Sequence, residues 1–96
     1  MQGIKISIEY SHDIMYDLGL NAERLLVEGR QIVISYLVNP FGYEVELEST
    51  PTDGETKTKL RLNKSNKRYF ADVSFSSVTK ENSSVLIAEI HIQPLP

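Results

Sequence analysis

Three groups of residues carry side chains whose types and spacing suit chemistry, and the first lies near the N-terminus. His12, Asp13 and Asp17 bring an imidazole and two carboxylates into one short stretch, as in a metal site or an acid–base pair. A metal site of this kind needs a further histidine or cysteine at ligand spacing, which the stretch lacks. We therefore interpret this group as a solvated polar turn that caps a helix, and we expect neither a metal nor a cofactor.

Glu44, Glu46 and Glu48 form the second group, because alternate positions of a strand share one face. Paired carboxylates on one face are the groups that hydrolyse glycosides. In the hairpin register derived next, each glutamate faces a cation, and such surface ion pairs contribute only tenths of a kcal/mol each. The sequence has no Gly-x-Ser-x-Gly turn and no glycine-rich phosphate loop, so we do not expect an enzyme.

Residues 43–62 predict a hairpin that turns at residues 51–54. Pairing Thr50 with Glu55 gathers opposite charges on one face and apolar side chains on the other. The predicted ion pairs are Glu48 with Lys57, Glu46 with Lys59 and Glu44 with Arg61, and the apolar pairs are Tyr43 with Leu62, Val45 with Leu60 and Leu47 with Thr58.

Two further strands are predicted from their side-chain patterns. Residues 3–10 alternate strictly between apolar and polar side chains, and residues 31–38 are rich in β-branched side chains. Residues 39–42 then form a turn with proline at its second position. This turn pairs Val38 with Tyr43, so that the second strand continues the apolar face of the hairpin.

Residues 11–30 allow two interpretations. In one, a helix begins after an N-cap at Ser11 or Asn21 and ends at Gly29. In the other, a turn pairs Tyr10 with Ile14 as neighbouring strands. We favour a helix over residues 21–28, because Ala, Glu, Arg and Leu are good helix formers.

Two more turns are predicted, at residues 64–67 and 79–84. The registers that follow place Asp72 between Lys59 and His91 on the charged face. His91 with Asp72 is the third group with chemical potential, and we interpret it as one more member of that face. These registers are set by pairing Asn63 with Arg68 and Val78 with Val85.

The hairpins agree in parity, which predicts a mainly β, α+β fold in one domain over residues 1–96. It consists of a five-stranded antiparallel meander over residues 31–93, an N-terminal strand, and one short helix that covers the apolar face. The alternative is an all-β sandwich of the immunoglobulin type or a small barrel, in which the N-terminal strand closes the sheet.

Composition narrows the class of function. The chain has 96 residues, 41% of them hydrophobic, a formal charge of −3 and no cysteine. The acidic balance gives no general attraction to nucleic acid or anionic lipid. The lack of cysteine favours a reducing compartment such as the cytoplasm, and we expect neither a signal peptide nor a membrane span.

Lys64, Lys67 and Arg68 form a candidate basic patch, because the hairpin register leaves them without carboxylates opposite. They adjoin Tyr69 and Phe70, and basic side chains beside aromatic ones are typical of proteins that bind single-stranded nucleic acid. The acidic total charge instead favours a solvated turn, so a small nucleic-acid-binding protein is kept only as an alternative.

Val33, Leu37, Phe70 and Ile87 fall at the margins of the charged face in the predicted sheet. Exposed apolar side chains at such margins are typical of contact surfaces. They form the candidate interface. The function we predict is a non-catalytic protein–protein interaction or assembly module, including self-association, with a protein partner rather than nucleic acid, a membrane or a small-molecule substrate.

Two resemblances to known families apply to parts of the chain. The order of strand, helix and antiparallel meander resembles that of the cystatins, and residues 25–29 keep the valine and glycine of their inhibitory Gln-x-Val-x-Gly motif without its glutamine. This resemblance implies a peptidase inhibitor. Residues 25–47 are similar to an immunoglobulin-like sandwich, which implies a module of a larger cell-surface or virion protein.

Overall fold

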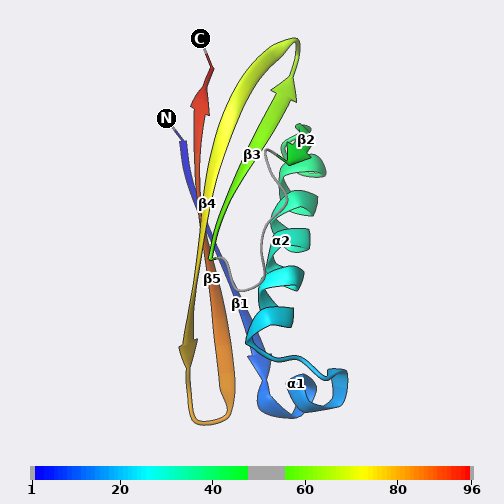
Figure 1. Cartoon of the computed structure of the whole chain (residues 1–96), viewed down its shortest axis with the longest axis vertical. Coiled ribbons are helices and arrows are strands. Elements are labelled where there is room, and N and C mark those ends of the chain that lie inside the picture. The colour runs from blue at the N-terminus through cyan, green and yellow to red at the C-terminus, as the bar shows by residue number, and fades with distance from the viewer. Residues whose placement is uncertain (1, 48–55, 96) are drawn as a thin grey trace.

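The chain folds into one antiparallel sheet with a long helix across one face (Figure 1). A computed structural model describes residues 2–47 and 56–95. The strand order is β1-β5-β4-β3-β2. The elements are β1 (Gln2–Ser11), α1 (His12–Leu18), α2 (Ala22–Val38), β2 (Glu44–Leu47), β3 (Lys57–Lys64), β4 (Lys67–Thr79) and β5 (Ser83–Pro94).

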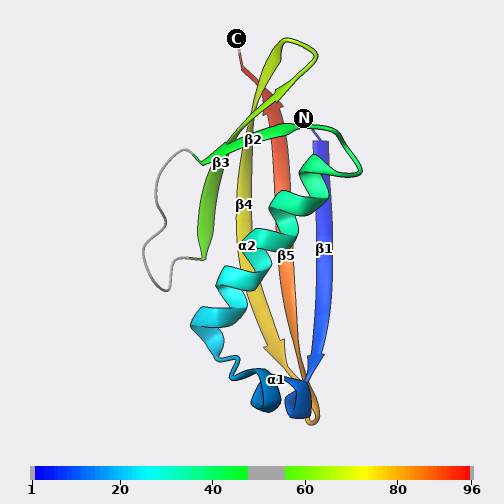
Figure 2. The same ribbon diagram turned by 90° about the vertical axis from the view of Figure 1, so that its right-hand side faces the viewer.

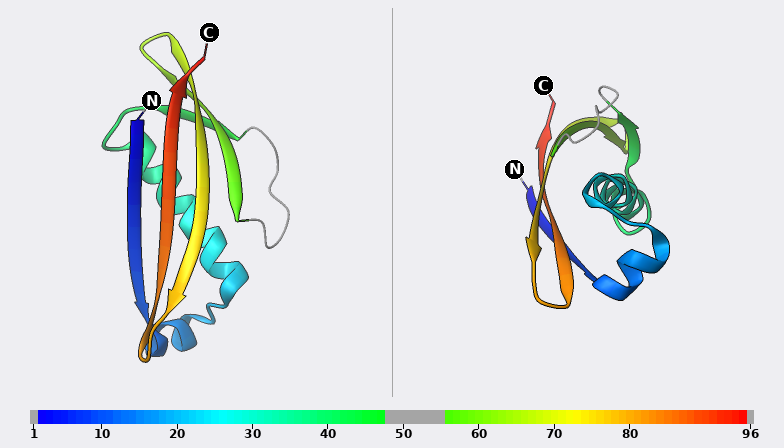
Figure 3. Two further views of the ribbon diagram at one scale, coloured as in Figure 1. Left: turned by 90° about the vertical axis from the view of Figure 1, so that its left-hand side faces the viewer. Right: turned by 60° about the horizontal axis from the view of Figure 1, so that its bottom comes forward.

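This architecture confirms the predicted mainly β, α+β class. In the described residues the strands lie in a single open sheet, so the sandwich and barrel alternatives are wrong. The helix α2 runs diagonally over one face, and the other face has no covering element among the described residues (Figures 2 and 3). Within the described part of the chain, no helix has the length and apolar character needed to cross a membrane.

The N-terminal strand is confirmed, and β1 pairs along its whole length with β5, from Gln2 opposite Ile92 to Ser11 opposite Ser83. Its alternating pattern puts partly buried isoleucines on the helix side and exposed polar residues on the open side. The interpretation of Tyr10 and Ile14 as paired strands is wrong, because the chain after Ser11 turns into α1.

Both predicted N-caps are confirmed. The Ser11 hydroxyl accepts a bond from the Ile14 N–H at 3.2 Å, and the Asn21 side-chain carbonyl accepts one from the Arg24 N–H at 3.0 Å. The predicted helix end is wrong: α2 continues through Gly29 to Val38, so residues 31–38 are helical and do not form a strand.

The reason is tertiary packing. Leu25, Gly29, Val33 and Leu37 recur every fourth residue, and all four are buried against the sheet. Gly29 allows a close approach there, because a Cβ at this position would lie 2.6 Å from the Leu86 side chain. This burial outweighs the strand preference of the β-branched side chains. Pairing Val38 with Tyr43 as strands is therefore also wrong.

The registers predicted for the last three strands are confirmed, with Asn63 opposite Arg68 and Val78 opposite Val85. The register predicted between β2 and β3 is wrong, because it differs from the observed one by two residues. Glu46 faces Arg61, and Glu44 faces the uncharged Asn63. A slip of two keeps every side chain on its predicted face, so alternation alone does not detect it. The predicted turn at residues 51–54 and the pairs of Glu48 and Thr50 lie outside the described residues.

The core lies between α2 and the sheet. Leu37 and Ile90 are completely buried, and Leu60 and Leu62 are almost so. Ile4 and Ile6 of β1 pack against the margin of this core. The hydrophobic core therefore joins the helix to the central strands β3, β4 and β5, and leaves β1 covered only in part.

Candidate interaction surfaces

The predicted interface of Val33, Leu37, Phe70 and Ile87 is not one surface. Val33 and Leu37 lie in the core, because they belong to the buried stripe of α2, so their assignment to a sheet margin is wrong. Phe70 and Ile87 are partly buried on the open face of the sheet. Ile87 pairs with Ser76, six residues along β4 from Phe70, a distance of about 20 Å. The four residues therefore do not form a joint binding site.

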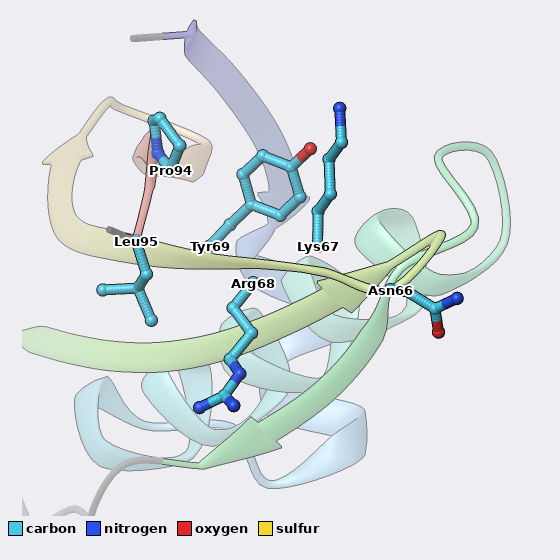
Figure 4. A pocket seen from close by; sticks show the side chains of 6 residues that line it. All are labelled: Asn66, Lys67, Arg68, Tyr69, Pro94 and Leu95. Atoms are coloured by element: carbon cyan, nitrogen blue, oxygen red, sulfur yellow. The ribbon is translucent and has the colours of Figure 1, made fainter.

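The candidate basic patch is divided between the two faces of the sheet. Lys64 and Lys67 lie opposite each other across a tight turn with positive φ at Ser65 and Asn66. Figure 4 shows the side chains of Lys67 and Tyr69 on one side of the strand and that of Arg68 on the other. These residues line an open hollow of about 390 Å³ together with Asn66, Pro94 and Leu95. The three cations thus offer no single face to a phosphate backbone.

Lys64 has a structural role in this region. Its Nζ lies 5.1 Å from the centroid of the Tyr43 ring, a cation–π contact at the end of the core. Tyr43 stacks edge-on to Tyr69 at 5.6 Å, and its N–H donates to the Leu37 carbonyl at 3.0 Å. Burial is the main cause that raises the pKa of Tyr43, and the charge interaction with neighbouring Tyr69 is a smaller cause in the same direction. These contacts fasten the connection between α2 and β2.

The residues considered for acid–base or metal chemistry are distributed along the sheet. His12 Nε2 lies 3.3 Å from the Ser84 hydroxyl, and the His12 N–H donates to the Asn82 carbonyl at 2.9 Å, so His12 ties α1 to the start of β5. His91 lies opposite Asp72, as the predicted register requires. Residues 2–47 and 56–95 contain no cluster of three or more metal-ligating side chains.

A surface that sequence analysis missed lies on α1. Its apolar side chains Ile14, Tyr16 and Leu18 are 50%, 88% and 62% exposed, and none of the seven residues of this helix is buried. We call these three side chains the α1 surface, with Ile14 and Leu18 on one side of the helix and Tyr16 on the other. The sequence did contain a signal, because a helix of two turns between Ser11 and Gly19 is too short to bury apolar residues on every side.

A groove of about 450 Å³ adjoins the α1 surface. It lies between the helices and the ends of β4 and β5, and its apolar lining comes from Met15, Leu25, Leu26, Phe75 and Leu86. Met15 belongs to α1, so the groove lies beside this helix. A recess beside protruding apolar side chains is the arrangement expected of a protein-binding surface.

At the same end of the molecule, Glu9 anchors the hairpin between β4 and β5. Its Oε2 lies 3.2 Å from Lys80 Nζ and accepts a bond of the same length from the Ser83 hydroxyl. The bond and charge of Lys80, with the smaller contribution of Ser83, lower the pKa of the Glu9 carboxyl. Glu9 is therefore a charged residue at the outer strand of the sheet.

Comparison with known proteins identifies no relative. No protein-family model matches the chain, no curated protein matches its sequence, and no solved structure matches its fold. The structure contains the order of strand, helix and antiparallel meander on which the cystatin resemblance rests, and it does not support the immunoglobulin-like resemblance. Residues 25–29 lie inside α2 rather than in an inhibitory loop, and residues 25–38 are helical rather than sandwich strands.

Proposed function

We infer that this chain is a non-catalytic protein–protein interaction or assembly module, and that the α1 surface is where it binds a protein partner. The observation that supports this proposal is the exposure of Tyr16 and Leu18 on a helix that buries none of its residues. Apolar area left in water costs about 25 cal/mol for each Å². A partner that covers this area would recover that free energy.

The local structure holds α1 ready for binding. The helix is capped at both ends, by the Ser11 hydroxyl and by Gly19 in the left-handed conformation with φ of 66°. His12 fastens its first turn to β5. A preformed helix presents its side chains without the entropic cost of ordering its backbone on binding.

The chemistry of the region describes the partner. Leu18 and Tyr16 protrude, while the groove beside Met15 is a recess, so the partner should offer both a hollow and a protruding apolar side chain. Asp13 and Asp17 are exposed on the same helix. We therefore expect basic residues around the apolar contact on the partner.

The proposal is tested by placing a photo-crosslinking amino acid, p-benzoylphenylalanine, at Tyr16 and irradiating the chain in a lysate of its source. Tyr16 is 88% exposed, so the substitution leaves the fold unchanged. We expect a discrete protein adduct, identified by mass spectrometry, that is lost when Leu18→Ser is added. The matched control carries the crosslinker at Ser74, exposed on the open face of the sheet.

Equal adducts at the two positions would contradict the proposal, because they would report random collision. So would the absence of any adduct at Tyr16. An adduct with a second copy of the chain would support the assembly form of the function, and an adduct with another protein would support the interaction form.

A further inference from the structure

The outer edge of β1 is the second feature of the molecule that lacks a partner. β1 stands at one end of the strand order, with β5 on one side and no strand of the described chain on the other (Figure 3). Its pairing with β5 is continuous, and it contains no proline. A long, regular edge strand of this kind is a template for pairing with another chain.

The backbone groups that face outward can be identified. Each residue of an antiparallel strand directs its N–H and C=O to the same side, and successive residues alternate. The register of β1 continues to His12, whose N–H donates to the Asn82 carbonyl just before β5. Even-numbered residues therefore bond β5, and odd-numbered residues direct their backbone groups outward. The outward residues of β1 are Gly3, Lys5, Ser7, Glu9 and Ser11.

We propose that β1 pairs antiparallel with β1 of a second copy about a two-fold axis at Ser7, joining the two five-stranded sheets into one. This inference rests on the proposed function, since it names a second copy as one partner of the module. An axis at Ser7 places outward residues opposite outward residues, as the backbone bonds of the new pair require.

Charge selects this register among the alternatives. With the axis at Ser7, Lys5 faces Glu9 of the second copy, and the contact occurs twice by symmetry. An axis at Lys5 or at Glu9 would set like charges against each other. An axis at Ile6 or Ile8 would leave both charges opposite uncharged residues. Only one of these registers is complementary in charge.

The apolar side of β1 agrees with the same register. Ile4, Ile6, Ile8 and Tyr10 are partly buried on the helix side, because α2 covers this margin incompletely. With the axis at Ser7, Ile6 lies beside Ile8 of the second copy, and Ile4 lies beside Tyr10. The pairing would therefore remove further apolar area from water on the side opposite the charges.

The other edge of the sheet, β2, differs from β1 in the charge of its exposed side chains. β2 has four residues against ten in β1, and its exposed side chains Glu44 and Glu46 are both acidic. Exposed charges of one sign on this edge disfavour pairing with another copy. The helix α1 also leaves the outer edge of β1 open, because it folds over the helix side of its own sheet (Figure 2).

The first test is a charge swap measured by sedimentation velocity over a concentration series. The unchanged chain should show a monomer–dimer equilibrium. Lys5→Glu or Glu9→Lys alone should raise the dimer dissociation constant about tenfold, and the double variant should restore most of the dimer.

Recovery in the double variant would identify the contact between copies, because within one chain both changes remain unfavourable. Lys5→Glu sets a second carboxylate opposite Glu89, and Glu9→Lys sets a second ammonium beside Lys80. Neither repulsion is relieved by the other change inside the monomer. The restored dimer would therefore report the pairing of positions 5 and 9 across the two-fold axis.

The second test removes one outward backbone donor. Ser7→Pro deletes an N–H that makes no bond to β5, so the monomer should stay folded by circular dichroism while the dimer is lost. The matched control is Ser7→Ala, which keeps the N–H and should keep the dimer. Should Ser7→Pro unfold the monomer, the charge swap still decides the register.

A chain that stays monomeric at every concentration would overturn this inference. If the crosslinker at Tyr16 still captured another protein, the proposed function would stand without it. A dimer that is insensitive to Lys5→Glu and Ser7→Pro but lost with Leu18→Ser would also overturn it, and would place the contact between copies on α1.

Discussion

The two helices use apolar side chains in opposite ways. α2 spans 17 residues and buries one residue in every four against the sheet, whereas α1 spans seven and buries none. Both have side-chain N-caps, and both contain exposed carboxylates near their starts. The difference shows that apolar content alone does not identify the core: in α2 it serves folding, and in α1 it remains available for binding.

The strongest way to test this contrast is to truncate the last residue of the buried α2 stripe. Leu37 is completely buried, so Leu37→Ala should lower the free energy of unfolding by about 2–5 kcal/mol in urea titration. The control is Val27→Ala on the outer side of the same helix, where the side chain is 51% exposed. That change should cost less than about 0.5 kcal/mol. Equal losses would mean that α2 does not pack by this stripe.

A second change tests the close approach at Gly29. A valine there would force Leu86 and Phe75 to move, since even a Cβ would come within 3.0 Å of Phe75. Gly29→Val should lower the free energy of unfolding by about 1–3 kcal/mol. Ser35→Val, at an exposed position of the same helix, adds the same β-branched side chain without the contact. A result in which both variants cost the same would mean that the contact with Leu86 and Phe75 is not the cause of the loss, since valine is a better helix former than glycine.

Gly29 also explains where prediction from the sequence succeeded and failed in this fold. A glycine followed by a β-branched stretch is typical of a helix end and a strand, and only the facing Leu86 and Phe75 show that the glycine permits close packing. The stripe of Leu25, Gly29, Val33 and Leu37 was present in the sequence but is interrupted by the residue with no side chain.

The registers show the same limit. β4 and β5 were predicted correctly, because a short turn and strict apolar alternation fix both the face and the pairing. Between β2 and β3 the charges suggested a pairing two residues away from the observed one. Exposed ion pairs are too weak to choose between registers that keep the same face.

The errors in the predicted elements also misplaced part of the candidate interface. Val33 and Leu37 were assigned to a surface only because their segment was taken as a strand, and helix formation moves both into the core. The α1 surface was missed because its signal, a helix of two turns between Ser11 and Gly19, depends on ending the helix at Gly19 rather than at Gly29. The edge of β1 became a candidate only when its partner was known to be the last strand, β5.

The N-caps offer a finer comparison of the two helices. Asn21→Ala removes the cap of a helix that belongs to the core, and should lower the free energy of unfolding by about 1 kcal/mol. Ser11→Ala removes an equivalent bond from α1, but it should mainly open that helix locally. Amide hydrogen exchange distinguishes the two, with faster exchange confined to α1 in Ser11→Ala. Exchange that rises throughout the chain would show that α1 unfolds together with the core.

The smallest effect on stability is expected from Leu18→Ser, and it bears most directly on function. Leu18 is 62% exposed, so its replacement should change the free energy of unfolding by less than about 0.5 kcal/mol while it weakens partner capture at the α1 surface. Leu25→Ser is the matched variant in α2, where the same side chain is 6% exposed and the cost should exceed about 2 kcal/mol. Similar losses for both leucines would mean that α1 packs as part of the core. The apolar side chains of α1 would then be structural, and none of them would be left to bind a partner.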